Sequence, residues 1–174
     1  MVIATASMLS FAQKKTSTSA TIAFDASTAI DDLPKAENKT AIAAIDPEKN
    51  TVQFEAAIKN FAFSNPSIQD HFNQKGWMNS DEFPKATFNG VITNPTAVNF
   101  KKDGTYNVTV EGDLTLKGKT QKVTTPATIV VAGTTLKANA AFNIKLADFG
   151  VAGQPITAGK VSGEPKISVA AELN

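Results

Sequence analysis

Residues 105–117 read TYNVTVEGDLTLK, a stretch in which apolar or small side chains alternate with polar ones without a slip. A period of two is typical of a β-strand that turns one face toward a core. The same period returns over residues 136–146, which read LKANAAFNIKL. Both stretches run to roughly twice the usual ~5 to 6 residues of a strand. Long strands with one apolar face predict a tall β-barrel.

The apolar faces of these two stretches contain Gly112, Ala138 and Ala140, which fill little volume. A barrel built from them is expected to enclose an apolar hollow that runs through the sheet, in place of a fully packed core. We expect the function of the protein to lie in that interior.

Turn signals and further alternating runs divide the rest of the chain into six more strands. The expected strands cover residues 20–24, 40–45, 52–58, 86–92, 106–116, 123–131, 136–146 and 166–173. The predicted fold is therefore all-β, an elongated eight-stranded antiparallel barrel.

Two local signals interrupt the strands. The apolar pattern changes phase after Asn60, which indicates a β-bulge or a change of face. Asn65 followed by Pro66 is a good helix start, because Asn caps the first turn and Pro is tolerated at its first position. One short helix is expected at about residues 66–74, near one end of the barrel.

The length of 174 residues fits one domain. Residues 1–12 are apolar and end in Ser-Phe-Ala, which fits a site cut by signal peptidase. We interpret residues 1–12 as a truncated signal peptide, 13–17 as a polar lead-in and 18–174 as a single barrel domain. This predicts a periplasmic or secreted protein. An apolar tail is the alternative, since the positively charged start of an export signal is missing.

Composition excludes several kinds of chemistry. The formal net charge is +1 and the chain has no Arg, so no nucleic-acid partner is expected. The absence of Cys removes disulfides, thiolate chemistry and Cys-ligated zinc. His71 is the only histidine, which rules out a three-His metal site. We expect no metal and no cofactor.

Catalytic residues are not expected either. A Ser-His-Asp triad would need His71 as its base, yet no Gly-x-Ser-x-Gly elbow presents a serine. The carboxylate pairs Asp31-Asp32 and Asp81-Glu82 fall in predicted loops and are typical of solvated turns. The ordinary interpretation of His71 is a helix histidine bonded to a backbone carbonyl. The alternative is a contact with the polar head group of a ligand.

Aromatic residues concentrate around the expected helix and its flanks. A helix across one end of a barrel is a natural lid, so these rings are expected to surround the mouth of an apolar pocket. Together with inward positions of the strands, the candidate ligand-binding residues are Phe24, Phe54, Ile58, Phe61, Phe63, Phe72, Trp77, Phe88, Tyr106, Val108, Phe142 and Ile144.

The same region carries a family resemblance. Residues 61–63, 68–73, 78–81 and 83–90 read FAF, IQDHFN, MNSD and FPKATFNG, which resembles the central signature of the YceI-like family, particularly the variant common in Bacteroidetes. Residues 104–118 resemble the long strand of this family and the turn that ends it. Residues 147–151, ADFGV, resemble its late Asp-aromatic-Gly element. These motifs occur in the family's order and extend from about residue 20 to the C-terminus.

The resemblance implies a lipocalin-like, exported barrel whose relatives bind a polyisoprenoid or isoprenoid quinone in an apolar channel. Lys117 stands where the family has a turn histidine, and the basic-acidic pair that often precedes the family's helix histidine is absent before His71. These departures concern the ligand's head group and leave the apolar channel unchanged.

Three functions follow as hypotheses. The leading one is an exported carrier of a long apolar, lipid-like ligand of the isoprenoid class, held in the barrel interior and exchanged by transient membrane contact. The alternatives are a ligand-free structural or stress-related interaction module and, as the weakest, an enzyme that uses His71. The sequence leaves the oligomeric state open, with a homodimer as one option.

Overall fold

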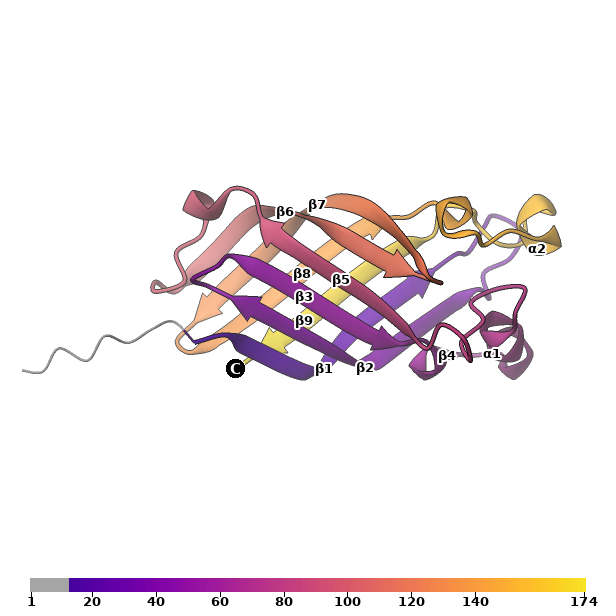
Figure 1. Cartoon of the computed structure of the whole chain (residues 1–174), viewed down its shortest axis with the longest axis horizontal. Coiled ribbons are helices and arrows are strands. Elements are labelled where there is room, and N and C mark those ends of the chain that lie inside the picture. Colours follow the sequence, from indigo (N-terminus) through magenta and orange to yellow (C-terminus); the bar gives the residue numbers. More distant parts are fainter. Residues whose placement is uncertain (1–12) are drawn as a thin grey trace, which may run out of the picture.

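Eight strands close into one antiparallel barrel in the computed structural model, which describes residues 13–174 (Figure 1). The barrel strands are β1 (Lys15–Asp25), β2 (Lys35–Asp46), β3 (Thr51–Ala57), β5 (Lys85–Ile92), β6 (Gly104–Leu116), β7 (Lys119–Ala132), β8 (Thr135–Asn143) and β9 (Lys166–Leu173). Their order around the barrel is β1-β9-β8-β7-β6-β5-β3-β2, and pairing of β1 with β2 closes it. The predicted fold class is confirmed.

The barrel has two different ends (Figure 1). The first strand begins and the last strand ends at one of them, where Thr16 N donates to Asn174 O at 3.2 Å. We call this the terminal end. The helices α1 (Pro66–Asn73) and α2 (Gln154–Thr157) lie at the opposite end, which we call the helical end.

The expected helix is confirmed at its N-terminus. The Asn65 side chain accepts a hydrogen bond from Ser67 N at 2.9 Å, and Pro66 occupies the first position of α1. Phe72 is the buried residue of this helix. The four-residue helix α2 was not predicted, because its sequence is too short to show helical periodicity.

The phase change after Asn60 is not a β-bulge. A turn of 3-10 helix over Ile58–Asn60 ends β3, and Ile58 N donates to Pro84 O at 2.8 Å. The chain then forms β4 (Ala62–Phe63), a two-residue strand that pairs with β2 outside the closed barrel. A helical turn rotates the chain, so the next apolar residues reappear in a new phase.

Several strand boundaries differ from the prediction, among them the start of β1 and the end of β8. β1 begins at Lys15, because Lys15 pairs with Ile45 of β2, so the polar lead-in expected over residues 13–17 is shorter. β8 ends at Asn143, because the next backbone groups turn to other partners: Ile144 N donates to Pro165 O at 3.2 Å. The signal peptide expected at residues 1–12 lies outside the described residues.

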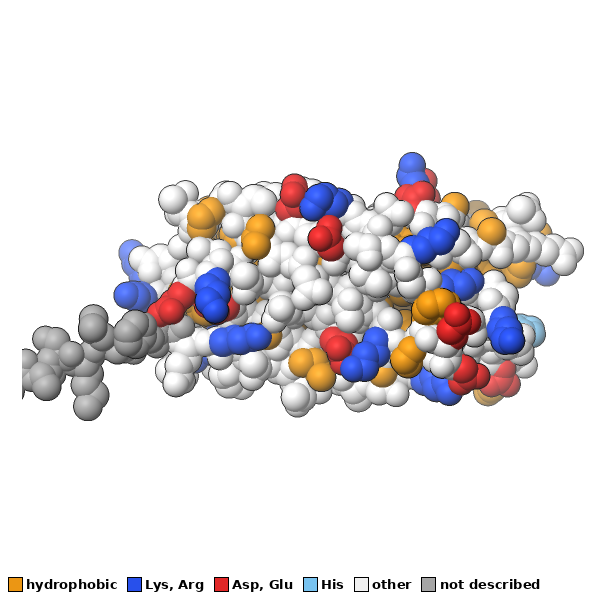
Figure 2. Space-filling model, in the orientation of Figure 1, with side chains coloured by type: hydrophobic (Ala, Val, Ile, Leu, Met, Phe, Trp, Pro, Cys, Tyr) orange, Lys and Arg blue, Asp and Glu red, His pale blue; other side chains and the backbone are white. Residues whose placement is uncertain are grey.

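The outer surface carries both signs of charge. Figure 2 shows Lys side chains and Asp or Glu side chains intermingled over the visible face. Several form ion pairs, such as Lys85 with Glu55 on the neighbouring strand at 2.7 Å. These pairs lie at the surface, where solvent screens them, so each contributes little to stability.

Candidate ligand-binding cavity

An apolar cavity of about 140 Å³ lies inside the barrel toward the helical end. Its walls come from all eight barrel strands, from α1 and from the segment after α1. The polar residues among its lining are Thr87, Thr125 and Asn139. An apolar site of this kind gains binding free energy from the burial of hydrocarbon and has few groups to bind charge.

Most of the predicted ligand-binding residues surround this cavity. Those that line it are Phe24, Phe54, Ile58, Phe61, Phe72, Trp77, Phe88, Phe142 and Ile144. Several of these inward rings are only partly buried, among them Phe24, Phe54 and Phe142. Since their strands turn them away from the outside, this remaining exposed surface faces the hollow.

Three predicted residues are not part of the lining: Phe63, Tyr106 and Val108. Phe63 packs behind Phe72, with ring centroids 4.9 Å apart. The Tyr106 hydroxyl donates to Lys102 O at 2.8 Å. Val108 is 3% exposed and packs in the core. A period of two tells which face a residue occupies but not its height along the barrel, which explains why these residues lie outside the lining.

Lining residues on β7 and β9 were not among those predicted. Thr125, Ala127 and Ile129 lie on one face of β7, and Ile167 and Val169 on one face of β9. Both stretches alternate in sequence, but they contain no aromatic side chain to mark them as a binding surface. The period of two applied evenly to all eight strands would have found them.

The small inward residues do not all leave space. Ala138 and Ala140 line the cavity as expected. Gly112 does not, because a Cβ there would lie 2.6 Å from Cζ of Phe88. Gly112 pairs with Gly90 across β5 and β6, and the Phe88 ring lies over both glycines. An aromatic ring thus fills the volume that the glycines leave open.

The hollow does not run through the whole barrel, contrary to expectation. Toward the terminal end the interior is packed with apolar side chains that do not line the cavity, including Val131, Leu136 and Leu173. Their exposed fractions are 2%, 3% and 0%. The barrel therefore has a filled part and a hollow part.

A cluster of four phenylalanines covers the hollow at the helical end. The Phe72 ring of α1 lies 6.0 Å from Phe24, 6.0 Å from Phe61 and 4.9 Å from Phe63, measured between ring centroids. The helix is held in place by the following segment, since Met78 N donates to Phe72 O at 3.0 Å. This aromatic cluster places α1 as the lid of the cavity.

His71 precedes Phe72 on α1 but is exposed and does not line the cavity. A head-group contact in the cavity therefore does not follow from the position of His71.

Within residues 13–174, no group of three or more His, Cys, Asp or Glu side chains is placed to hold a metal ion.

Three of the family motifs, in residues 83–90, 104–118 and 147–151, lie far apart in the chain but meet at the helical end. Lys117, which has a left-handed backbone with φ of 50°, donates from Nζ to Gly150 O at 3.3 Å. Gln121 Nε2 donates to Asp148 O at 3.1 Å. The Phe83 ring lies against Gly118, where a Cβ would come within 2.7 Å of it. Lys117 thus contacts backbone outside the cavity.

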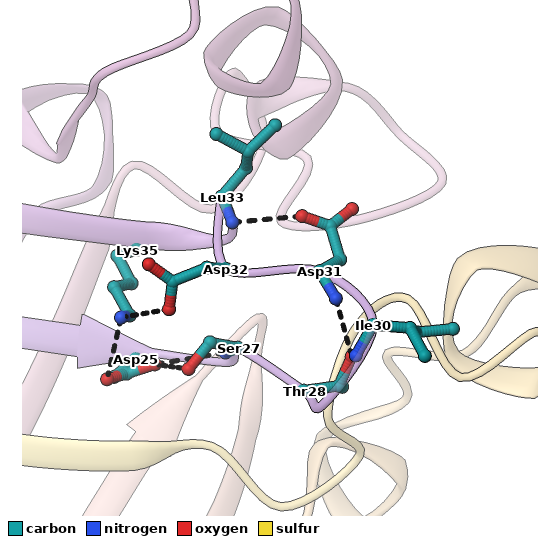
Figure 3. Close-up of polar contacts among 8 residues, drawn as sticks. All are labelled: Asp25, Ser27, Thr28, Ile30, Asp31, Asp32, Leu33 and Lys35. Carbon is teal, nitrogen blue, oxygen red and sulfur yellow. Dashed lines mark hydrogen bonds and ion pairs between the residues drawn. The ribbon is translucent and has the colours of Figure 1, made fainter.

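The loop between β1 and β2 also lies at the helical end, and its own polar groups hold it (Figure 3). Asp31 N donates to Thr28 Oγ1 at 3.2 Å, and Leu33 N donates to Asp31 Oδ1 at 2.9 Å. Burial would raise the pKa of Asp25 at the loop's start, but hydrogen bonds from Ser27 together with the nearby charges of Lys35 and Lys166 lower the pKa overall. These bonds fix the shape of the loop.

Two large aliphatic side chains of this loop point away from its hydrogen bonds (Figure 3). Ile30 is 71% exposed and Leu33 is 49% exposed. Both belong to the same end of the barrel as the aromatic cluster.

Among residues 13–174, no helix has the length and apolar character needed to cross a membrane.

A closed, lipocalin-like barrel with an apolar interior cavity is the class of protein that this geometry defines. The sequence model of the YceI-like domain matches residues 3–173, and the chain belongs to this family. A search of curated proteins found no match.

Solved structures share the fold. A polyisoprenoid binding domain from Saccharophagus degradans, implicated in plant cell wall breakdown, has a TM-score of 0.77 and 11% identity, over 92% of this chain and 97% of that one. BcnA of Burkholderia cenocepacia has a TM-score of 0.71 and 22% identity, over 89% and 96%. The YCEI protein of Campylobacter jejuni gives 0.53 and 18%, over 76% and 80%. At such identities the likeness concerns the fold.

Proposed function

We propose that this protein binds an apolar, lipid-like ligand in its interior cavity and carries it. The observation that carries the proposal is the cavity itself, lined by phenylalanines and aliphatic side chains and covered by an aromatic lid. Membership of the YceI-like family and the likeness to a polyisoprenoid binding domain support apolar binding as the general function. A ligand of the polyisoprenoid or isoprenoid quinone class is the specific form of the proposal.

The energetics favour a carrier that exchanges its ligand. Each buried methylene is worth about 0.8 kcal/mol relative to water, so even a short prenyl chain has ample driving force to leave water. Such molecules reside in membranes, however, where their chains are already buried. The net preference for the protein is then small, which suits exchange better than tight sequestration.

Two further parts of the proposal concern location. The end of residues 1–12 in Ser-Phe-Ala supports export to the periplasm or beyond. Exchange of the ligand would occur by transient membrane contact through Ile30 and Leu33, since both side chains are exposed at the helical end of the barrel. Fractionation of the producing cells tests export: the mature protein should begin at Gln13 outside the cytoplasm, and an unprocessed cytoplasmic chain would contradict it.

A ligand-free interaction module is the second candidate, and the packed terminal part of the barrel favours it. An enzyme that uses His71 has less support, because this side chain is exposed outside the cavity. The cavity and the fold likeness support binding as the leading proposal.

Native mass spectrometry and organic extraction of the purified protein separate these candidates. A carrier should release a defined prenyl lipid after expression in a lipid-rich host. A Val91→Ser variant is the control, because Val91 is 46% exposed on the outer wall of the barrel. It should carry a ligand of the same mass as the wild-type protein does. A protein that is empty, and that also takes up no prenyl alcohol added to it, would contradict the proposal.

A further inference from the structure

The lining of the cavity stops partway along three adjoining strands, and on two of them the last lining residues, Ile129 and Ala138, are paired with each other. On β6, β7 and β8 the last lining residues toward the terminal end are Val110, Ile129 and Ala138. The next inward positions on these strands are Val108, Val131 and Leu136, which do not line it. We call Ile129 and Ala138 the floor of the cavity.

The packing beneath this floor is complete. Val108 is 3% exposed, Val131 2% and Leu136 3%, and Leu136 pairs with Leu173, which is fully buried. Protein interiors packed in this way leave no passage for a chain of methylene groups. A ligand therefore cannot extend through the terminal end.

The helical end is closed by a different kind of structure from the terminal end. Its cover is made of α1, of the two-residue strand β4 and of side chains, not of the closed sheet, and Phe24 and Trp77 on the lining of the cavity are only partly buried. Side chains and short helices move far more readily than a closed sheet. Entry from this end requires displacement of rings and leaves the barrel intact.

The volume limits what fits beneath the lid. At about 140 Å³ the cavity is close to an engineered apolar cavity of about 150 Å³ that binds benzene. A volume of this size holds on the order of one or two isoprene units of hydrocarbon. A longer polyisoprenoid would leave most of its chain outside.

We infer that the cavity is a blind pocket, open only toward the helical end, whose floor at Ile129 and Ala138 sets the length of apolar tail that it accepts. This inference rests on the proposed function and names its ligand class more closely. The class is an amphiphile with one short prenyl or alkyl tail, or the terminal units of a longer isoprenoid, which enters tail first with its polar group at the lid.

A chain-length series tests the inference. The probes are prenol, geraniol, farnesol and geranylgeraniol, which contain one to four isoprene units, each titrated below the concentration at which it forms micelles. Competition with an apolar fluorescent dye gives their affinities. We expect a rise of more than about tenfold per unit until the tail meets the floor, and less than about threefold per unit beyond it.

Floor variants should move that limit in opposite directions. Ala138→Phe raises the floor and should bring the plateau to a shorter alcohol. Ile129→Ala deepens the pocket and should bring it to a longer one. Val151→Ala truncates a side chain that is buried outside the cavity and should leave the plateau where it is. Ala138→Phe removes no packing, so it provides the test even if Ile129→Ala fails to fold.

The outcomes separate this inference from the proposed function. Failure of every alcohol to bind the wild-type protein would contradict the proposed function itself. Binding that strengthens steadily through geranylgeraniol, with no change in either floor variant, would keep the carrier and overturn the blind pocket. A plateau that moves with the floor supports both.

Discussion

Phe72 and His71 are successive residues of α1 that lie in opposite environments. Phe72 is 8% exposed and touches three other phenylalanine rings, whereas His71 is exposed. Tilted rings with centroids 4.5 to 7 Å apart attract one another beyond the effect of buried area. At the scale of single residues, the lid therefore depends on the phenylalanine and not on the histidine.

A matched pair of substitutions tests this difference. Phe72→Ala should lower the free energy of unfolding by about 3 kcal/mol, because it leaves a void among aromatic rings. His71→Ala should change it by less than about 0.5 kcal/mol and should leave ligand affinity unaltered. Urea denaturation followed by the fluorescence of Trp77, the single tryptophan, measures both. Equal effects of the two changes would refute the assignment of Phe72 as the lid.

At the scale of elements, β5 and β6 approach each other through a pair of glycines. Gly90 and Gly112 lie opposite each other, and a Cβ on Gly112 would stand 2.5 Å from Asn89 O. The glycines make room for the Phe88 ring, which lies across both strands. This cross-strand arrangement replaces the hollow that the small residues alone would leave.

Alanine substitutions of two glycines measure how tight this arrangement is. Gly112→Ala should lower the free energy of unfolding by about 2 kcal/mol, because its new methyl group overlaps backbone and ring. Gly76→Ala introduces the same group where no atom lies within 4 Å, and should be neutral or slightly stabilising. Thermal unfolding of both variants provides the comparison. A neutral Gly112→Ala would disprove the close contact.

The loop between β1 and β2 is the second element with a testable role. Ile30→Ser combined with Leu33→Ser should reduce flotation with vesicles of phosphatidylethanolamine and phosphatidylglycerol by at least about tenfold, because two exposed aliphatic side chains no longer enter the bilayer surface. Ile42→Ser is the control, since Ile42 is 48% exposed on the barrel wall. An equal loss in the control would argue against the loop as the contact.

At the scale of the whole molecule, the barrel combines a packed part and a hollow part. The packed terminal end supplies contacts that hold the sheet closed, while side chains around the cavity lack partner atoms on one side. A ligand that fills the cavity restores those contacts. Its binding is therefore expected to stabilise the fold in proportion to ligand concentration and affinity.

The sequence predicted this architecture better than it predicted the site. Alternation in residues 105–117 and the Asn65-Pro66 helix start depend on local patterns, and both predictions were confirmed. Tyr106 and Val108 face inward but do not line the cavity, because height along a barrel depends on strand stagger. That Phe88 covers Gly112 depends on the register between β5 and β6, which no single strand contains.

Binding of farnesol to the wild-type protein and to Ala140→Trp tests the central claim most directly. Ala140 lines the cavity on β8, so an indole at this position occupies the space assigned to the ligand. We predict saturable binding and a raised melting temperature for the wild type. For the variant we predict a folded barrel with an affinity at least about a hundredfold weaker, because its cavity is filled. Equal affinities of the two folded proteins would show that the ligand does not bind inside the barrel.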